Sequence, residues 1–109
     1  MYSVSKKIHI AASHRLELDE PTKCARPHGH NYEIEVFCRA GQLDGNGMVV
    51  DFQLIKERVT DKLDHRNLNE VLPFNPTAEN IARWICDQIP HCYKVIVRET
   101  PDNTATYEK

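Results

Sequence analysis

The sequence has no long apolar run and no excess of charge of one sign. No stretch of its 109 residues approaches the roughly 18 apolar residues that cross a membrane, and residues 1–7 lack the apolar core of a secretion signal. The 14 basic and 16 acidic residues give a formal net charge of -2, without a block of Lys or Arg. This pattern argues against a nucleic-acid or membrane partner, and we expect a cytoplasmic protein.

The sequence also lacks the patterns of a disulfide scaffold and of a dinucleotide site. Four cysteines, Cys24, Cys38, Cys86 and Cys92, stand at irregular spacings, which favours reduced thiols. Cys38 and Cys86 fall on apolar faces, where a thiol behaves as a small hydrophobe. The Gly-x-Gly-x-x-Gly fingerprint, internal repeats and low-complexity tracts are all missing. Residues 1–109 are therefore expected to form one domain.

Apolar periodicity predicts an α+β architecture. Alternating apolar and polar residues predict strands over residues 8–16, 28–38, 93–99 and 104–107. Helical spacing and start signals predict one helix from Asp51 to about residue 64 and another from Thr77 to Pro90. The order strand, strand, helix, helix, strand, strand indicates an antiparallel sheet with both helices on one face.

Two connections matter for function. Residues 17–27 are polar and contain Pro21 and Pro27, so we expect a long loop that delivers Cys24. Residues 48–52 follow a glycine-rich turn and fit either a short strand or the entry into the first helix.

Three histidines fall on inward rows of the first two expected strands. His28 and His30 are two residues apart, so their side chains share a face, and His14 ends the inward row of the preceding strand. A single inward histidine is usually a hydrogen-bonded core residue, but three at neighbouring strand ends favour a shared metal. Three imidazoles without an obligatory fourth ligand describe an open zinc site, although imidazole also suits iron, copper and nickel.

Cys24 admits two functional interpretations. It could close a structural zinc site as a fourth ligand, or it could stay unbound and act as a base or nucleophile. The adjacent residues Asp64 and His65 could complete a proton relay with a thiol that folding brings near. Without such a thiol nearby, Asp64 and His65 could simply be the last residues of a helix.

Glu99 ends the inward row of the third strand. A carboxylate at a strand end is usually solvated, but this row also holds Val95 and Val97. A buried carboxylate needs hydrogen-bond donors, such as the paired N–H groups of a heterocycle.

Several motifs together resemble one enzyme family. The sequence is similar to the 6-pyruvoyl-tetrahydropterin synthase and 6-carboxy-tetrahydropterin synthase family in segments 12–16, 24–32, 49–52, 63–69, 76–80 and 97–100. The Cys-x3-His-Gly-His spacing and the Val-Asp-Phe motif look like the bacterial 6-carboxy-5,6,7,8-tetrahydropterin synthases of queuosine biosynthesis. The connection 89–93 is shorter than is usual in that family.

The resemblance implies a fold, an assembly and a metal. The family has a tunnelling fold, with a four-stranded antiparallel sheet and two helices per subunit in the order ββααββ. Its subunits join into an oligomeric barrel, and two stacked trimers form a homohexamer. The residues that match the family's Zn²⁺ ligands are His14, His28 and His30.

The resemblance also assigns catalytic and substrate-binding roles. Cys24 matches the proton-abstracting base, Asp64 with His65 matches a second proton-handling pair, and Glu99 matches the anchor of the pterin ring. Active sites in this family lie between subunits, so Cys24 and His65 are expected to come from different copies.

The implied reaction converts 7,8-dihydroneopterin triphosphate to 6-carboxytetrahydropterin, acetaldehyde and triphosphate. Candidates to meet the triphosphate are Arg15, Lys23, Arg26 and Arg66, and the sequence does not choose among them. One alternative is 6-pyruvoyl-tetrahydropterin formation or a related pterin activity on the same scaffold. Another is a zinc-binding module without catalysis, in which Cys24 is the fourth ligand.

Overall fold

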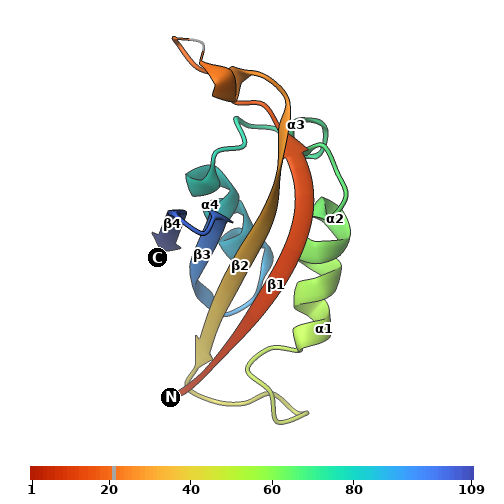
Figure 1. Cartoon of the computed structure of the whole chain (residues 1–109). Helices are drawn as coiled ribbons and strands as arrows, with labels where there is room; N and C mark the ends of the chain where they lie inside the picture. Colours follow the sequence, from red (N-terminus) through yellow and green to blue (C-terminus); the bar gives the residue numbers. More distant parts are fainter. Residues whose placement is uncertain (21) are drawn as a thin grey trace.

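The computed structural model describes residues 1–20 and 22–109, and Pro21 of the expected loop lies outside the described residues. Four antiparallel strands form one sheet in the order β1-β2-β3-β4. Their bounds are Tyr2–His14 for β1, His28–Ala40 for β2, Cys92–Thr100 for β3 and Asn103–Glu108 for β4. Figure 1 shows β1 and β2 as two long curved strands beside each other, with the main helices behind them.

The strands are longer than the apolar alternation predicts. β1 begins at Tyr2 instead of residue 8, because its polar N-terminal half pairs with the C-terminal half of β2 from Tyr2↔Ala40 onward. It ends at His14 and leaves Leu16 outside the strand, so the predicted end at residue 16 is wrong. Backbone pairing with β2 extends the strand where side-chain pattern gives no signal.

The first helical segment is continuous but irregular. It consists of α1 (Phe52–Ile55), a π-helical turn η2 (Lys56–Thr60) and α2 (Asp61–Leu63). Asp51 caps it as expected, because its Oδ1 accepts a hydrogen bond from the Gln53 N–H at 2.9 Å. Of the two interpretations of residues 48–52, the entry into the helix is confirmed.

A short helix missed by the sequence interpretation, α3 (Leu68–Val71), precedes the long helix α4 (Ala78–Gln88). Thr77 caps α4 by accepting the Asn80 N–H on its Oγ1 at 3.1 Å, as its position before the apolar repeat predicts. The expected order ββααββ is therefore correct for the main elements and incomplete by one helix.

The core lies between the helices and one face of the sheet. The inward residues of β1 to β3 are buried against apolar residues of η2 and α4, among them Val59 and Ile85. Cys38 and Cys86 are buried in this core, and all four cysteines are free, as expected. No helix in the described part of the chain combines the length and apolar character needed to cross a bilayer.

The opposite face of the sheet is polar. Arg98 Nη1 lies 3.4 Å from Glu33 Oε2 and 3.5 Å from Glu35 Oε1, so charged side chains of β2 and β3 pair across the ladder. The metal-site candidates thus lie on the helix-covered face, at the end of the sheet where β1 stops and β2 starts.

Candidate metal centre and active site

The antiparallel register of β1 and β2 brings the three histidines together. In this register His14 is paired with His28, and Ala12 is paired with His30. The side chains of His14, His28 and His30 therefore point to the same face of the sheet. The nitrogen ligand atoms of His14, His28 and His30 all lie within 4.8 Å of one another. The sequence-based prediction that these three rings converge is confirmed in its geometry.

Hydrogen bonds orient two of the rings. His14 Nδ1 donates to the Pro76 carbonyl at 2.8 Å, and His28 Nδ1 donates to the Arg26 carbonyl at 2.7 Å. Because a carbonyl oxygen only accepts, Nδ1 carries the hydrogen in both rings and Nε2 keeps its lone pair. The two Nε2 atoms lie 3.0 Å apart, and each is the ligand atom that a metal would use.

Burial keeps the central rings neutral. Desolvation lowers the pKa of His14, and the neighbouring His28 adds to this effect, against the hydrogen bond to Pro76 and the carboxylate of Glu99. Desolvation likewise lowers the pKa of His30, with Glu99 opposing it. Neutral imidazole is the form that binds metal.

The donor set fits a zinc ion. Tetrahedral coordination at ordinary Zn–N lengths places ligand nitrogens about 3.3 Å apart. The 3.0 Å separation of His14 and His28 Nε2 is close to this value. Three imidazole nitrogens with no thiolate among them would leave a fourth position for another ligand, which is typical of catalytic zinc.

Glu99 and Tyr32 complete the inner wall. Glu99 Oε1 lies 3.4 Å from His14 Nε2 and 3.5 Å from His30 Nε2, and the Glu99 side chain is 20% exposed. The hydroxyl oxygen of Tyr32 lies 3.3 Å from His14 Nδ1, and burial raises the pKa of this tyrosine. Glu99 therefore faces the cluster, as its inward position predicted.

Cys24 occupies the short 3-10 helix η1 (Lys23–Ala25) in the connection between β1 and β2. Its N–H donates to Thr22 Oγ1 at 3.2 Å, its carbonyl accepts the Leu16 N–H at 2.8 Å, and the residue is exposed. Cys24 is not a member of the group of candidate ligand atoms that His14, His28 and His30 form.

Asp64 and His65 form a tight segment against the edge of β1. Asp64 Oδ1 accepts the Ala11 N–H at 2.9 Å, and the His65 N–H donates to the Ala11 carbonyl at 2.7 Å. Asp64 Oδ2 lies 3.6 Å from His65 Nε2, so the carboxylate and imidazole are neighbours, as the predicted relay requires. His65 has a positive φ of 59°, and its side chain is 82% exposed.

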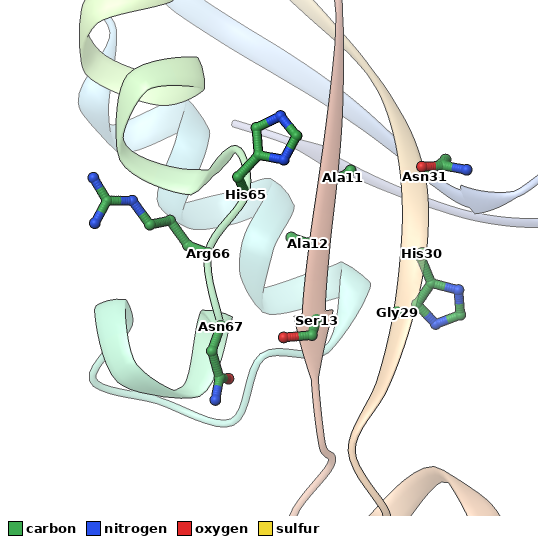
Figure 2. Close-up of a pocket in the computed structure, with 9 residues that line it drawn as sticks. All are labelled: Ala11, Ala12, Ser13, Gly29, His30, Asn31, His65, Arg66 and Asn67. Carbon is green, nitrogen blue, oxygen red and sulfur yellow. The ribbon is translucent and has the colours of Figure 1, made fainter.

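His65 and the metal cluster lie on opposite sides of β1 and β2. Figure 2 shows His65 beyond the β1 edge and His30 across the two strands. Both residues, with Arg66 and Asn67, line a groove of about 450 Å³ that runs over Ser13 and Gly29. Arg66 thus lies in a groove, whereas Arg15 lies 3.9 Å from Glu17 in an exposed ion pair.

Two features of the site carried no usable sequence signal. The Pro76 carbonyl that orients His14 is a backbone group, which residue type cannot reveal. The docking of residues 64–67 on β1 depends on a left-handed backbone at His65. Tyr32 could have been found, because it continues the inward row of His28 and His30.

The four-stranded sheet with helices on one face and the three-histidine cluster define an α+β protein with a candidate metal centre. A sequence profile of the family described as 6-pyruvoyl tetrahydropterin synthase matches residues 3–109. The chain belongs to this family.

Curated relatives carry more than one pterin activity in their names. The chain is 31% identical to the 6-carboxy-5,6,7,8-tetrahydropterin synthase of Bacillus subtilis, over 97% of this chain and 84% of the relative. It is 34% identical to the 6-pyruvoyl tetrahydrobiopterin synthase of Dictyostelium discoideum, over 91% and 86%. It is 40% identical to the dihydroneopterin monophosphate aldolase of Pyrococcus furiosus, over 72% and 66%.

Solved structures agree on the fold. The 6-pyruvoyl tetrahydropterin synthase of Caenorhabditis elegans superposes with a TM-score of 0.78 at 28% identity, covering 99% of this chain and 95% of that chain. The Plasmodium falciparum enzyme superposes with a TM-score of 0.68 at 20% identity, covering 98% of each chain. The names of these relatives therefore support an enzyme that acts on a pterin, but the names differ in the reaction product that they indicate.

Proposed function

We propose that the chain is a zinc-dependent 6-carboxy-5,6,7,8-tetrahydropterin synthase. In this proposal, one domain over residues 1–109 converts 7,8-dihydroneopterin triphosphate and water to 6-carboxytetrahydropterin, acetaldehyde and triphosphate, for the queuosine precursor pathway. The observation that carries the proposal is the set of three imidazole nitrogens within 4.8 Å of one another, beside an inward carboxylate. The Bacillus subtilis relative favours the carboxy product.

His14, His28 and His30 would hold the zinc ion through Nε2 of the first two and a nitrogen of the third. Bound there, zinc would polarise the side-chain oxygens of the substrate and ease loss of the adjacent protons. Pro76 and Arg26 carbonyls keep the Nε2 atoms of His14 and His28 free for this role.

Glu99 would fix the orientation of the pterin. Its carboxylate accepts hydrogen bonds, and a pterin offers an amino group and a neighbouring ring N–H in a plane. Glu99 Oε1 lies 3.4 Å from His14 Nε2, so a pterin held by Glu99 would lie beside the candidate metal position.

Cys24 would take up a proton from the substrate side chain, and His65 with Asp64 would handle a second one. An exposed thiol on the η1 tip is accessible to a bound substrate. In a single chain His65 lies across β1 from His30, which favours a site that combines Cys24 of one copy with His65 of another.

The proposed assembly is a homohexamer made of two trimeric barrels. β1 and β4 are the two outer strands of the sheet order, so each can pair with an outer strand of a neighbouring copy. The proposal requires this closure because it brings the two halves of the site together.

The 6-pyruvoyl activity is the second candidate, since the Dictyostelium relative and the Caenorhabditis structure both carry that name. One assay separates the two. The zinc-loaded protein is incubated without oxygen with 7,8-dihydroneopterin triphosphate, and the products are identified by mass. Carboxytetrahydropterin together with acetaldehyde supports the proposal, whereas a pterin that keeps a three-carbon side chain contradicts it.

A further inference from the structure

The connection that carries Cys24 projects beyond the sheet. Figure 1 shows it as the extension above the ends of β1 and β2. The helix η1 within this connection buries none of its residues, so packing on the core does not hold it. The position of Cys24 therefore depends on contacts at the base of the connection, where the chain leaves His14.

Leu16 makes the contact between the two arms of this connection. Its N–H donates to the Cys24 carbonyl at 2.8 Å. In an extended chain, the backbone groups of the flanking residues Arg15 and Glu17 point to the opposite side. These flanking groups face two asparagine side chains.

Asn69 binds both backbone groups of Arg15. Its Oδ1 accepts the Arg15 N–H at 2.8 Å, and its Nδ2 donates to the Arg15 carbonyl at 2.9 Å. Asn75 repeats the arrangement on Glu17, accepting the N–H and donating to the carbonyl, both at 2.9 Å. A side-chain amide has the donor and acceptor of a peptide group, so each asparagine replaces one residue of a neighbouring strand.

The two asparagines tie Cys24 to the rest of the site. Asn69 belongs to α3, which directly follows the segment of Asp64 and His65. Asn75 directly precedes Pro76, whose carbonyl orients His14. The base of the Cys24 connection is thus fixed to both elements that hold the other proposed functional groups.

We propose that Asn69 and Asn75 are positioning residues for Cys24, holding the extended segment Arg15–Glu17 so that Leu16 fixes the Cys24 backbone. This inference rests on the proposed function for its catalytic meaning. Misplacing a reacting group by about 1 Å costs up to about 100-fold in rate. We expect binding of the pterin ring, which Glu99 would hold, to be unaffected.

The test uses the zinc-loaded full chain with Asn69→Ala, Asn75→Ala and the isosteric Asn69→Asp. The matched control is Asn46→Ala, in the distant turn after Asp44. We expect kcat to fall about tenfold or more in both alanine variants, with KM within twofold and zinc content unchanged. Asn69→Asp keeps the acceptor for the Arg15 N–H, so it should recover part of the lost kcat even if the alanine variants fold poorly.

Amide hydrogen exchange at Leu16 gives a second readout that does not depend on activity. Neither asparagine touches the Leu16 N–H, which reports on the bond to Cys24. We expect its exchange to be at least tenfold faster in the alanine variants and unchanged in Asn46→Ala. Unchanged Leu16 exchange, or an equal loss of zinc and of pterin binding, would overturn the positioning role. If Leu16 exchanges faster in the alanine variants but the unsubstituted protein never turns over the substrate, the positioning of the Cys24 backbone by Asn69 and Asn75 would stand and the proposed function would be rejected.

Discussion

His14 and His28 face each other across the β1–β2 ladder, with their Nε2 atoms 3.0 Å apart. Both rings already use Nδ1–H to donate to carbonyls, so two nitrogen lone pairs are directed at the same point. Such an arrangement is stable only with a shared proton or a cation between the nitrogens. A metal ion bound there would accept a nitrogen lone pair from each of the three rings.

Loss of one ring should therefore release the metal. We expect His30→Ala to lower zinc affinity at least about 100-fold, because removal of a direct ligand should exceed the 10–100-fold effect typical of outer-shell partners. The measurement is zinc content after dialysis against a calibrated chelator. His9→Ala, on the exposed face of β1, is the matched control and should keep its zinc. Equal zinc retention in both variants would contradict the three-histidine site.

Replacement of Cys24 separates a base from a ligand. We expect Cys24→Ala to retain zinc and to lose turnover by about 100- to 10,000-fold, the usual effect of removing a proton-transfer group. Zinc content and the rate of product formation are measured on the same sample. Loss of zinc in this variant, together with an inactive parent protein, would instead support a non-catalytic zinc module.

Glu99→Gln tests the pterin anchor. A hydrogen bond to a charged group contributes about 1.5–3 kcal/mol, so pterin affinity should fall roughly 10- to 150-fold while zinc content stays the same. Titration calorimetry with the carboxytetrahydropterin product gives the affinity. Glu33→Gln, which alters the polar face of the sheet beside Arg98, serves as control. Unaltered affinity in Glu99→Gln would remove this residue from the site.

The cysteines should differ sharply in reactivity. Burial raises the pKa of the Cys86 thiol to about 12, whereas Cys24 is exposed. At pH 8 we expect iodoacetamide to modify Cys24 and to leave Cys86 unmodified in the folded protein, because the thiolate is the reactive form. Peptide mass spectrometry identifies the modified residue, and urea-unfolded protein shows that both can react. Modification of Cys86 at the rate of Cys24 under native conditions would disprove its burial.

The sequence predicted the metal cluster because it depends on one simple rule. Side chains two residues apart share a face of a strand, and antiparallel pairing then places His14 opposite His28. The same rule placed Glu99 inward. The caps Asp51 and Thr77 were also predictable, since each is a short polar residue directly before an apolar helical repeat.

Features set by tertiary contacts were not predictable. The π-helical turn at Lys56–Thr60 and the positive φ of His65 have no distinct residue pattern. The segment after Asp64 docks on β1 through backbone groups, which every residue possesses. The hydrogen bonds of Asn69 to Arg15 and of Asn75 to Glu17 likewise join residues far apart in sequence. Asparagine near the start of a helix is common because its side chain bonds to nearby backbone groups, so its presence there does not reveal a long-range contact.

The docking of residues 64–67 on β1 has a geometric consequence for assembly. This segment pairs with β1 at Ala11 and Ser13, whereas Tyr2 to His9 have β2 as their partner strand in the described part of the chain. In the proposed assembly, the β4 strand of a neighbouring copy would therefore have to stop short of Ala11, and its register along β1 could not shift toward the histidines. In the proposed ring of copies, the Asp64 segment would act as a spacer that sets the separation between active sites.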